Sequence, residues 1–199
     1  APQTRQLSLD TGRCIFCSQC VRACDAGAVR FTRDFRMASS SRTALVVTDH
    51  SPLPAVELDD VICRTLGRAL RLRQVSAGGC NACEADTNVL GTVGWDLGRF
   101  GVQFVASPRH ADGLLITGPV TQNMRTAVEK TYQAVPAPKI VIAVGACAIA
   151  GGPYIDHPEV HNGAASVVPV DVYVPGCPPH PLTILHALLA AIRVQAAGP

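Results

Sequence analysis

The hydrophobic pattern of the chain changes at about residue 76. From there on, short apolar runs rich in Val, Ile and Leu alternate with candidate helices. The short runs are typical of buried strands, and four are predicted, over residues 102–106, 113–117, 139–144 and 171–174. Helices are predicted over residues 123–132 and 182–194. Strands that alternate with helices in this way form a parallel sheet covered by helices on both faces.

The first 75 residues follow a different pattern. Residues 1–46 are polar over short distances and contain four closely spaced cysteines, with a predicted loop or hairpin tip at residues 38–42. Residues 47–58 include Ser-Pro-Leu-Pro and predict a linker. A helix is predicted over residues 61–72, with Asp59 or the aspartate after it as its N-cap. The predicted division is therefore a small segment over 1–46, a linker and connecting helix over 47–75, and a larger domain over 76–199.

Charged residues make up only 16% of the chain, against about a quarter in a typical soluble domain. This shortfall indicates that other subunits cover much of the surface. The net charge of +2 argues against a general nucleic-acid-binding surface. The charge is uneven, since residues 1–75 hold 11 Lys and Arg against 7 Asp and Glu, whereas residues 76–199 hold 6 against 8. A mildly basic front half suits an acidic partner, although solvated arginines explain it equally well.

No apolar run approaches the ~20 residues that a membrane-spanning helix needs. The longest run, over residues 182–194, contains His186 and Arg193 and is predicted to be a buried helix. No signal peptide is recognisable, and the chain does not begin with Met.

Four of the nine cysteines form the first candidate site. Cys14, Cys17, Cys20 and Cys24 have the spacing C-x2-C-x2-C-x3-C. This spacing lets a tight loop wrap three corners of a [4Fe–4S] cluster and leaves backbone N–H groups free to bond its sulfides. Structural zinc is the alternative, but it usually takes two separated pairs of cysteines rather than a triplet. A disulfide framework is typical of small secreted chains and does not suit a chain of this size and hydrophobicity.

The sequence leaves the fourth ligand of this cluster open. Asp25 stands where ferredoxins usually have Pro, and no second run of this spacing is present. In two-cluster ferredoxins the fourth cysteine of each run binds the other cluster, so Cys24 either closes its own cluster or is spare. Cys63 is the competing ligand. Two clusters need eight thiolates and the chain has nine, so we expect one of these two cysteines to be left over.

Cys80, Cys83, Cys147 and Cys177 form the second candidate site. Cys147 and Cys177 each follow a predicted strand, and ligands of an open parallel sheet bind beyond the carboxyl ends of the strands. The loop from Cys80 to Cys83 precedes a predicted helix and can close the site from the other side, while flanking glycines permit close approach of the backbone. Four thiolates also fit tetrahedral zinc. The adjacent ferredoxin-like motif favours a second [4Fe–4S] cluster, because a cluster needs a neighbour with which to exchange electrons.

Several polar residues near the second site are candidates for supporting roles. Glu84 could relay protons or pair with an arginine of a partner, or it could simply be a favourable first-turn acid of a helix. Arg109 and the histidine after it could touch a partner or tune the cluster potential, although such residues more often anchor a loop. His180 could donate a hydrogen bond to a cluster sulfur. Trp95 is predicted to be a core or interface aromatic rather than an electron relay.

Two parts of the chain resemble known families. Residues 9–38 are similar to the second cluster motif of the polyferredoxin subunits of formate hydrogenlyase complexes. From Leu70 to its end, the chain resembles the small subunit of the membrane-bound, energy-converting (group 4) [NiFe] hydrogenases and its relative, the NuoB-type subunit of respiratory complex I. The matching stretches, in family order, are residues 79–84, 96–101, 106–112, 117–124, 145–147 and 169–181. The separation of Cys80 from Cys83 is hydrogenase-like, whereas residues 88–95 depart from both groups.

We therefore predict an α/β fold with a flavodoxin-like parallel sheet and helices on both faces, preceded by a small ferredoxin-like segment. The resemblance implies that the second site holds the cluster nearest a hydrogenase-like (NuoD-type or large-subunit-type) catalytic subunit, with the N-terminal cluster as a relay. The chain would be a non-catalytic redox subunit, held by other Fe–S or membrane subunits on the inner, cytoplasmic face of a membrane. A complex I-like or quinone-linked assembly is one alternative, and a zinc module without redox activity is another.

Overall fold

The computed structural model describes residues 7–49, 51, 54–58 and 69–193. Its centre is a five-stranded sheet in the order β4-β3-β5-β6-β7, with all neighbours parallel. The strands are β3 (Leu70–Ser76), β4 (Val102–Phe104), β5 (Gly113–Thr117), β6 (Ile140–Val144) and β7 (Val172–Val174). With β3 counted as the first strand, this is the 2-1-3-4-5 order of flavodoxin-like sheets, as predicted.

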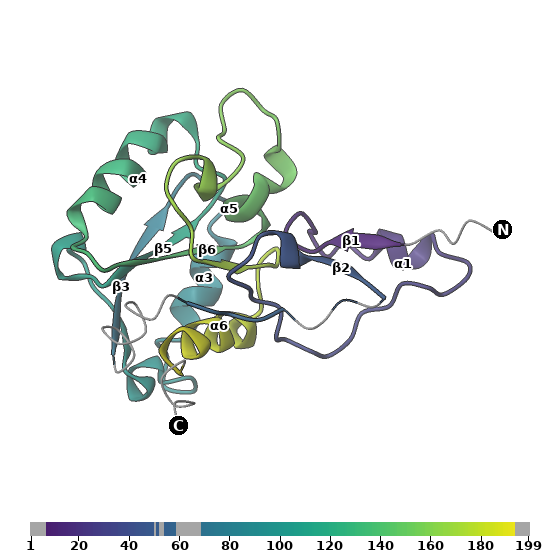
Figure 1. Cartoon of the computed structure of the whole chain (residues 1–199), viewed down its shortest axis with the longest axis horizontal. Helices are drawn as coiled ribbons and strands as arrows, with labels where there is room; N and C mark the ends of the chain where they lie inside the picture. The colour runs from purple at the N-terminus through teal and green to yellow at the C-terminus, as the bar shows by residue number, and fades with distance from the viewer. Residues whose placement is uncertain (1–6, 50, 52–53, 59–68, 194–199) are drawn as a thin grey trace.

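Helices cover both faces of this sheet, which confirms the α/β prediction (Figure 1). α4 (Gln122–Ala134) and α5 (Ala146–Ala150) lie on one face, and α3 (Ala82–Val89) and α6 (Pro181–Arg193) lie on the other. On β5, Leu115 packs into the core that includes α6, whereas Leu114 and Ile116 pack into the core that includes α4 and α5. All three side chains are fully buried. Burial on both faces explains why the strand is apolar at every position.

Short 3-10 helices occupy several connections: η1 (Thr43–Leu45), η2 (Leu97–Phe100), η3 (Pro108–His110), η4 (Gly152–Tyr154) and η5 (Ala164–Ser166). Within the described ranges, none of the helices combines the length and the apolarity needed to cross a bilayer.

The N-terminal segment projects from the sheet but is anchored to its β7 edge (Figure 1). β1 (Ser8–Asp10) pairs antiparallel with β2 (Val46–Thr48), and the short helix α1 (Gln19–Arg22) lies between them in sequence. Ser39 forms an antiparallel bridge to Tyr173, with N···O distances of 3.0 and 2.8 Å. An edge strand otherwise presents unpaired backbone groups, so this bridge caps β7. The predicted loop at 38–42 is therefore a buried anchor at Ala38 and Ser39 rather than a free tip.

The four predicted strands and the two predicted helices beyond residue 76 are all present, with ends shifted by at most two residues. The prediction of a linker and connecting helix up to residue 75 is wrong for residues 70–75, because they belong to β3, the second strand of the sheet. Leu70 and Leu72 are buried while Arg71 is exposed, which is the two-residue period of a strand. The remainder of the predicted helix falls largely on residues 59–68, which lie outside the described residues. The sheet of the larger domain thus begins at Leu70 rather than at residue 76.

Candidate metal centre

The cysteines of the second site gather at the carboxyl edge of the sheet. Cys80 lies between β3 and α3, and Cys83 lies in the first turn of α3. Cys147 lies in α5, directly after β6, and Cys177 comes three residues after the end of β7. Backbone hydrogen bonds of 2.8 Å from Gly145 N–H to the Val174 carbonyl, and from Ala146 N–H to the Gly176 carbonyl, tie these last two loops together. The parallel sheet therefore brings together cysteines that are far apart in sequence.

Two glycines make room for the thiols of this site. A Cβ on Gly145 would lie 2.5 Å from Cys83 Sγ, and a Cβ on Gly152 would lie 2.7 Å from Cys147 Sγ. Both contacts are shorter than real Cβ atoms show, and both glycines have positive φ, of 92° and 57°. The backbone is thus shaped to let each sulfur lie directly against it. Gly145 also connects the site across the sheet edge, because it belongs to the β6 loop and Cys83 belongs to α3.

The four thiols share one electrostatic environment. Burial, followed by the Glu84 carboxylate and the other three thiols, raises the pKa of Cys83 to about 12. Burial, followed by Cys177, Cys80 and Glu84, raises the pKa of Cys147 to about 11. Since each of these thiols disfavours ionisation of another, all four lie within electrostatic reach of one another.

This donor set fits an iron–sulfur cluster. A cysteine binds iron as its thiolate, and thiols with raised pKa values become thiolates when the positive charge of a metal centre compensates them. Insertion of a cluster would therefore release protons. Within the described ranges, no three or more Cys, His, Asp or Glu side chains are grouped so that they could hold a metal ion. In a [4Fe–4S] cluster, by contrast, each thiolate binds a different iron.

Glu84 lies beside this site and is buried, with 5% of its surface exposed. Its Oε1 accepts hydrogen bonds of 2.6 Å from the hydroxyls of Ser76 and Thr117. Ser76 ends β3 and Thr117 ends β5, so the carboxylate sits where the strand order of the sheet reverses. Glu84 lies in the first turn of α3, where one of the two predictions from the sequence placed it as a first-turn acid. Its side chain is buried against the sheet rather than exposed to solvent. Its part in proton relay or partner binding stays a prediction.

Arg109 lies away from the second cysteine site. It is exposed in η3, four residues before β5 begins, and the contacts of the described residues do not connect it with the cysteine loops. The carboxyl edge that carries the cysteines is the opposite end of β5. The structure therefore offers no support for tuning of a cluster by Arg109, and contact with a partner stays a prediction.

The first site is a surface loop held by local contacts. Phe16 N–H donates to Cys14 Sγ at 3.3 Å, and Ala28 N–H donates to Cys24 Sγ at 3.3 Å. Phe16 and Ser18 have positive φ of 57° and 64°, a backbone conformation found in tight loops whose successive N–H groups bind anions. Cys20 lies in α1. That this loop binds a cluster through its backbone N–H groups stays a prediction.

The environment of Cys24 favours its thiolate. The backbone N–H of Ala28, with smaller contributions from the N–H groups of residues 26, 27 and 29, lowers the pKa of Cys24 below its ordinary value, although burial opposes this. An amide nest of this kind stabilises a sulfur that carries negative charge, as a cluster ligand does. Cys63, the competing ligand, lies outside the described residues. The choice between the two stays a prediction.

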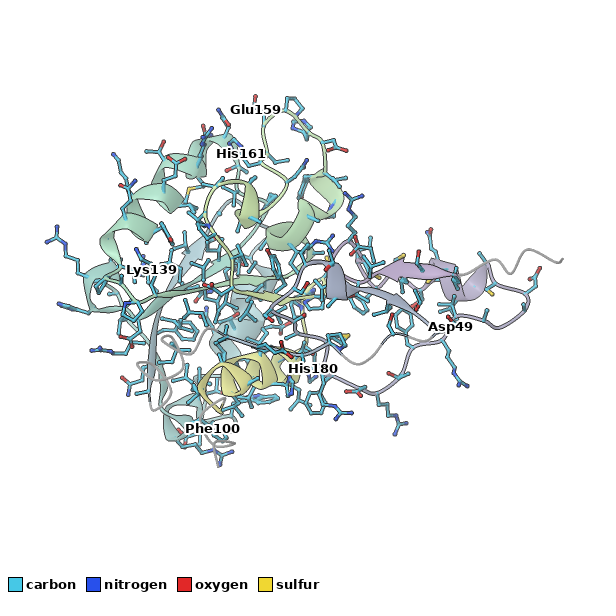
Figure 2. The ribbon with its side chains drawn as sticks, viewed as in Figure 1. Asp49, Phe100, Lys139, Glu159, His161 and His180 are labelled. Carbon is cyan, nitrogen blue, oxygen red and sulfur yellow. The ribbon has the colours of Figure 1, made fainter. Side chains whose placement is uncertain are left out.

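The two sites lie next to each other. The pKa of Cys177 is raised by burial, then by Cys80, and then by Cys14 of the N-terminal segment. His180 lies at the junction, where Figure 2 shows it between the body of the molecule and the projecting segment. Its Nδ1 accepts the Leu182 N–H at 3.1 Å, so the neutral ring carries its proton on Nε2. His180 lines the same cavity as Cys14, which places it between the two sites rather than on the second alone.

Sequence reasoning missed the two hydroxyl donors to Glu84 and the pairing of glycines with thiols. Ser76 and Thr117 are the last residues of β3 and β5. Because the strand over residues 113–117 was predicted, its last residue, Thr117, could have been expected at the edge of the sheet that carries the cysteines. Ser76 could not be placed, because β3 itself was not predicted.

Comparison with known proteins matches both parts of the chain. The family described as NADH ubiquinone oxidoreductase, 20 kDa subunit, matches residues 80–191, and the 4Fe-4S binding domain matches residues 7–30. The chain is 44% identical over 132 residues to the probable membrane-bound hydrogenase subunit mbhJ of Pyrococcus furiosus, covering 66% of this chain and 79% of that protein. It is 41% identical over 143 residues to formate hydrogenlyase subunit 7 of Escherichia coli, covering 69% of this chain but only 56% of that protein.

Two further relatives agree with these matches. An NADH-quinone oxidoreductase subunit of Clostridium beijerinckii is 45% identical over 112 residues, covering 56% of this chain and 66% of that protein. A chain in the structure of the membrane-bound sulfane sulfur reductase, an archaeal respiratory membrane complex, superposes with a TM-score of 0.56 at 32% identity, covering 71% of this chain and 80% of that one. The protein is therefore an iron–sulfur electron-transfer polypeptide that belongs to the family of the 20 kDa subunit of NADH ubiquinone oxidoreductase, with a 4Fe-4S binding domain on the N-terminal side of the family match.

Proposed function

We propose that this chain carries two [4Fe–4S] clusters and relays electrons to or from the active site of a hydrogenase-type large subunit in a membrane-associated complex. The observation that supports it most is the closeness of the two cysteine sites: Cys14 of the first site lines one cavity with His180, which comes three residues after Cys177 of the second. Neighbouring clusters can exchange electrons directly. The named relatives are subunits of hydrogenase, formate hydrogenlyase and NADH-quinone oxidoreductase, which supports a place in such a complex.

Each proposed cluster has its own ligand set. Cys80, Cys83, Cys147 and Cys177 hold the second cluster, and Cys14, Cys17, Cys20 and Cys24 hold the first. Bound clusters supply one-electron redox chemistry at potentials that depend on hydrogen bonds, charge and solvent exposure. The protein contributes these three factors through its own residues.

The residues around the second site exclude water from one side only. Cys83 and Cys147 are partly buried against the sheet, whereas Cys80 and Cys177 are exposed. The exposed side is where we place the catalytic partner, which would complete the shielding of the cluster. Glu84 is held on the protein side by Ser76 and Thr117, so its charge has a fixed position relative to the sulfurs.

The metal content of the purified complex tests this proposal. We expect about eight iron and eight sulfide per chain and an EPR signal on reduction, because each cluster contains four of each. Cys83→Ser and Cys17→Ser should each remove about four irons and leave the other four. Two zinc ions per chain with little iron would instead identify the zinc module and refute the proposal.

The fourth ligand of the first cluster needs a paired comparison. Cys24→Ser should lower the iron content by about four, and Cys63→Ser should leave it unchanged. The opposite result would identify Cys63 as the fourth ligand. If neither substitution loses iron, the first cluster does not have the ligands proposed here.

The identity of the large subunit distinguishes the two redox assemblies. Two C-x2-C pairs in its sequence, together with H2 evolution from a low-potential electron donor, would support the hydrogenase-type complex. A partner that lacks these pairs and reduces a quinone would support the complex I-like alternative. Fractionation of cells should place the chain on the inner face of the membrane, released together with its partner subunits.

A further inference from the structure

The N-terminal segment exposes an unusual share of the apolar surface. Of the nine large hydrophobic side chains that are exposed among the described residues, five lie within residues 7–46. They are Leu7, Ile15, Phe31, Phe35 and Val46. Exposed apolar side chains mark an interaction surface where they lie together, whereas scattered ones are normal.

Phe31 is, with Phe35, one of the two among these five that line a common cavity. It is 47% exposed, and its ring lies 5.9 Å from the ring of Phe16, centroid to centroid. Both rings line a cavity of about 530 Å³ between the N-terminal segment and the start of α6. Cys14 lines the same cavity. A molecule that touches Phe31 therefore comes close to a ligand of the first cluster.

The charge of the segment is not balanced by its own carboxylates. Residues 7–48 contain six arginines and three aspartates, a surplus of 6 − 3 = +3. Arg36 pairs with Asp34 at 2.9 and 2.7 Å. Arg42 pairs with Asp10 at 2.9 and 2.7 Å, and Arg13 lies 3.7 Å from the same carboxylate. Three of the six arginines thus share two carboxylates.

Arg30 and Arg33 are the cations that this pairing leaves over beside Phe31. Both are exposed, both line the cavity with Phe16 and Phe31, and neither has a salt bridge in the part of the chain that the structure describes. We call Phe16, Arg30, Phe31 and Arg33 the Arg–Phe patch. Arginine and aromatic residues are the types enriched in the buried centres of protein interfaces.

We propose that the Arg–Phe patch is the docking surface for an acidic protein that carries a one-electron centre and exchanges electrons with the first cysteine site. The proposal rests on the proposed function, because it needs a cluster at Cys14, Cys17 and Cys20. Carboxylates of the carrier pair with Arg30 and Arg33, and an apolar side chain of the carrier covers Phe31. One electron passes from the reduced carrier to the oxidised cluster. The carrier is oxidised by one electron, the cluster is reduced by one, and no proton or further reactant is needed.

The rate of reduction of the purified complex tests the proposal. The probe is a reduced, acidic two-[4Fe–4S] ferredoxin, mixed with the complex in a stopped-flow instrument at several salt concentrations. Opposite charges accelerate association by roughly 10-fold to 1000-fold at low ionic strength, and salt removes this gain. We expect the second-order rate constant of the wild type to fall steeply with salt.

The variant Arg30→Glu/Arg33→Glu should lower the rate constant at low salt by about 10-fold or more and should lose most of the salt dependence. The matched control is Arg125→Glu/Lys130→Glu on α4, which lies at the other end of the molecule from α1 (Figure 1). It changes the net charge by the same −4 and should keep the rate within about twofold of the wild type. Phe31→Ala should lower the second-order rate constant by the same factor at every salt concentration, because it removes an apolar contact and no charge.

The outcomes separate this proposal from the proposed function. If the complex contains eight irons and is reduced by dithionite, but the patch variant and the α4 control behave alike, the docking proposal is overturned and the cluster assignment stands. If iron is missing from the first site in the wild type, the proposed function fails first.

Accessibility of the arginines provides a second measurement. Phenylglyoxal should modify Arg30 and Arg33 in the purified complex, and the ferredoxin should protect them. Protection already present without ferredoxin would show that a permanent subunit covers the patch, and would overturn the assignment to a carrier.

Discussion

The two cysteine sites are built in opposite ways. Between residues 7 and 37 only Gly12 is buried, so the first site is a loop that its own backbone holds in shape. The second site stands on β6 and β7, in which every residue is buried. A site of the first kind needs only short spacing along the chain. A site of the second kind exists only when the whole sheet has formed.

The difference also separates the tasks of the two sites. The first is reachable from solvent, with Cys17 exposed and the Arg–Phe patch beside it. The second has Cys83 and Cys147 partly buried against the sheet and a buried carboxylate at its side, while Cys80 and Cys177 are exposed. A projecting loop suits exchange with an outside carrier, and a site that is buried on one side and open on the other suits a fixed position against a catalytic partner. Four measurements test this difference between the sites, in order of decreasing expected effect.

The largest expected difference lies in thiol reactivity before clusters are inserted. At pH 8, Cys83, with its pKa of about 12, is almost entirely protonated, whereas backbone N–H groups lower the pKa of Cys24 and so increase its thiolate fraction. Iodoacetamide should therefore alkylate Cys24 much faster than Cys83, as read by mass spectrometry of the peptides. Raising the pH should accelerate the alkylation of Cys83 about tenfold per unit and that of Cys24 by less.

Unfolding in guanidinium chloride is the control for this experiment, since it should make both cysteines react alike. Equal reactivity in the folded chain would mean that the second site is not shielded.

The second measurement concerns the glycines of the two regions. Gly145→Ala places a Cβ 2.5 Å from Cys83 Sγ at φ 92°, so we expect the loss of about four irons. Gly27→Ala is the matched control in the first region, because Gly27 also has positive φ, of 63°, but has nothing within 4 Å of the added Cβ. It should cost only about 1–2 kcal/mol of local conformational energy and keep all the iron. Equal iron loss in both variants would show that φ, and not the sulfur contact, matters.

The third measurement is the reduction potential of the second cluster. Glu84→Gln removes a buried negative charge but keeps an oxygen to accept the Ser76 and Thr117 hydroxyls. The reduced cluster is the more negative form, so the potential should rise by on the order of tens of millivolts in an EPR-monitored titration. The potential of the first cluster should not move.

Glu84→Ala is the companion variant. It should show the same rise in potential and also a lower Tm, because the buried Thr117 hydroxyl loses its acceptor at a cost of about 1–3 kcal/mol, while the exposed Ser76 hydroxyl can bond water instead. A second-cluster potential that is unchanged in both variants would argue against an ionised carboxylate at this position.

The smallest effect is expected at the ion pair that closes the N-terminal segment. Burial alone would raise the pKa of Asp10, but hydrogen bonds and the charge of Arg42 hold it below its ordinary value. The stability from this pair is therefore present above the ordinary pKa of Asp and is lost as the pH falls through the lowered value. Arg42→Gln should destabilise the segment by about 1 kcal/mol at pH 7, with little difference from the wild type at pH 2. Hydrogen exchange of β1 and β2 measures this, and protection in β5 should not change.

Local patterns in the sequence were sufficient for most of the larger domain. Residues 113–117 and 140–144 are continuous apolar runs, and such runs form strands wherever both faces of a sheet are covered. The first cysteine loop could also be predicted from the sequence, because its cysteines are separated by only two or three residues. The strand β3 was missed, because its alternating Leu and Arg follow directly on a segment with helical spacing.

The amino-acid sequence established which residue types are available: nine cysteines, eight of them in two sets and Cys63 apart, strands followed by glycine or proline, and a surplus of arginine near the N-terminus. The packing of the chain in three dimensions established which of these residues meet. It placed Glu84 between Ser76 and Thr117, set Gly145 against Cys83, left Arg109 away from the cysteines, and brought Cys14 within reach of Cys177. The physical reason is the range of the forces involved: hydrogen bonds and side-chain contacts act over a few ångströms, and residues dozens of positions apart come that close only through the packing of the sheet, its helices and the segment anchored at its edge.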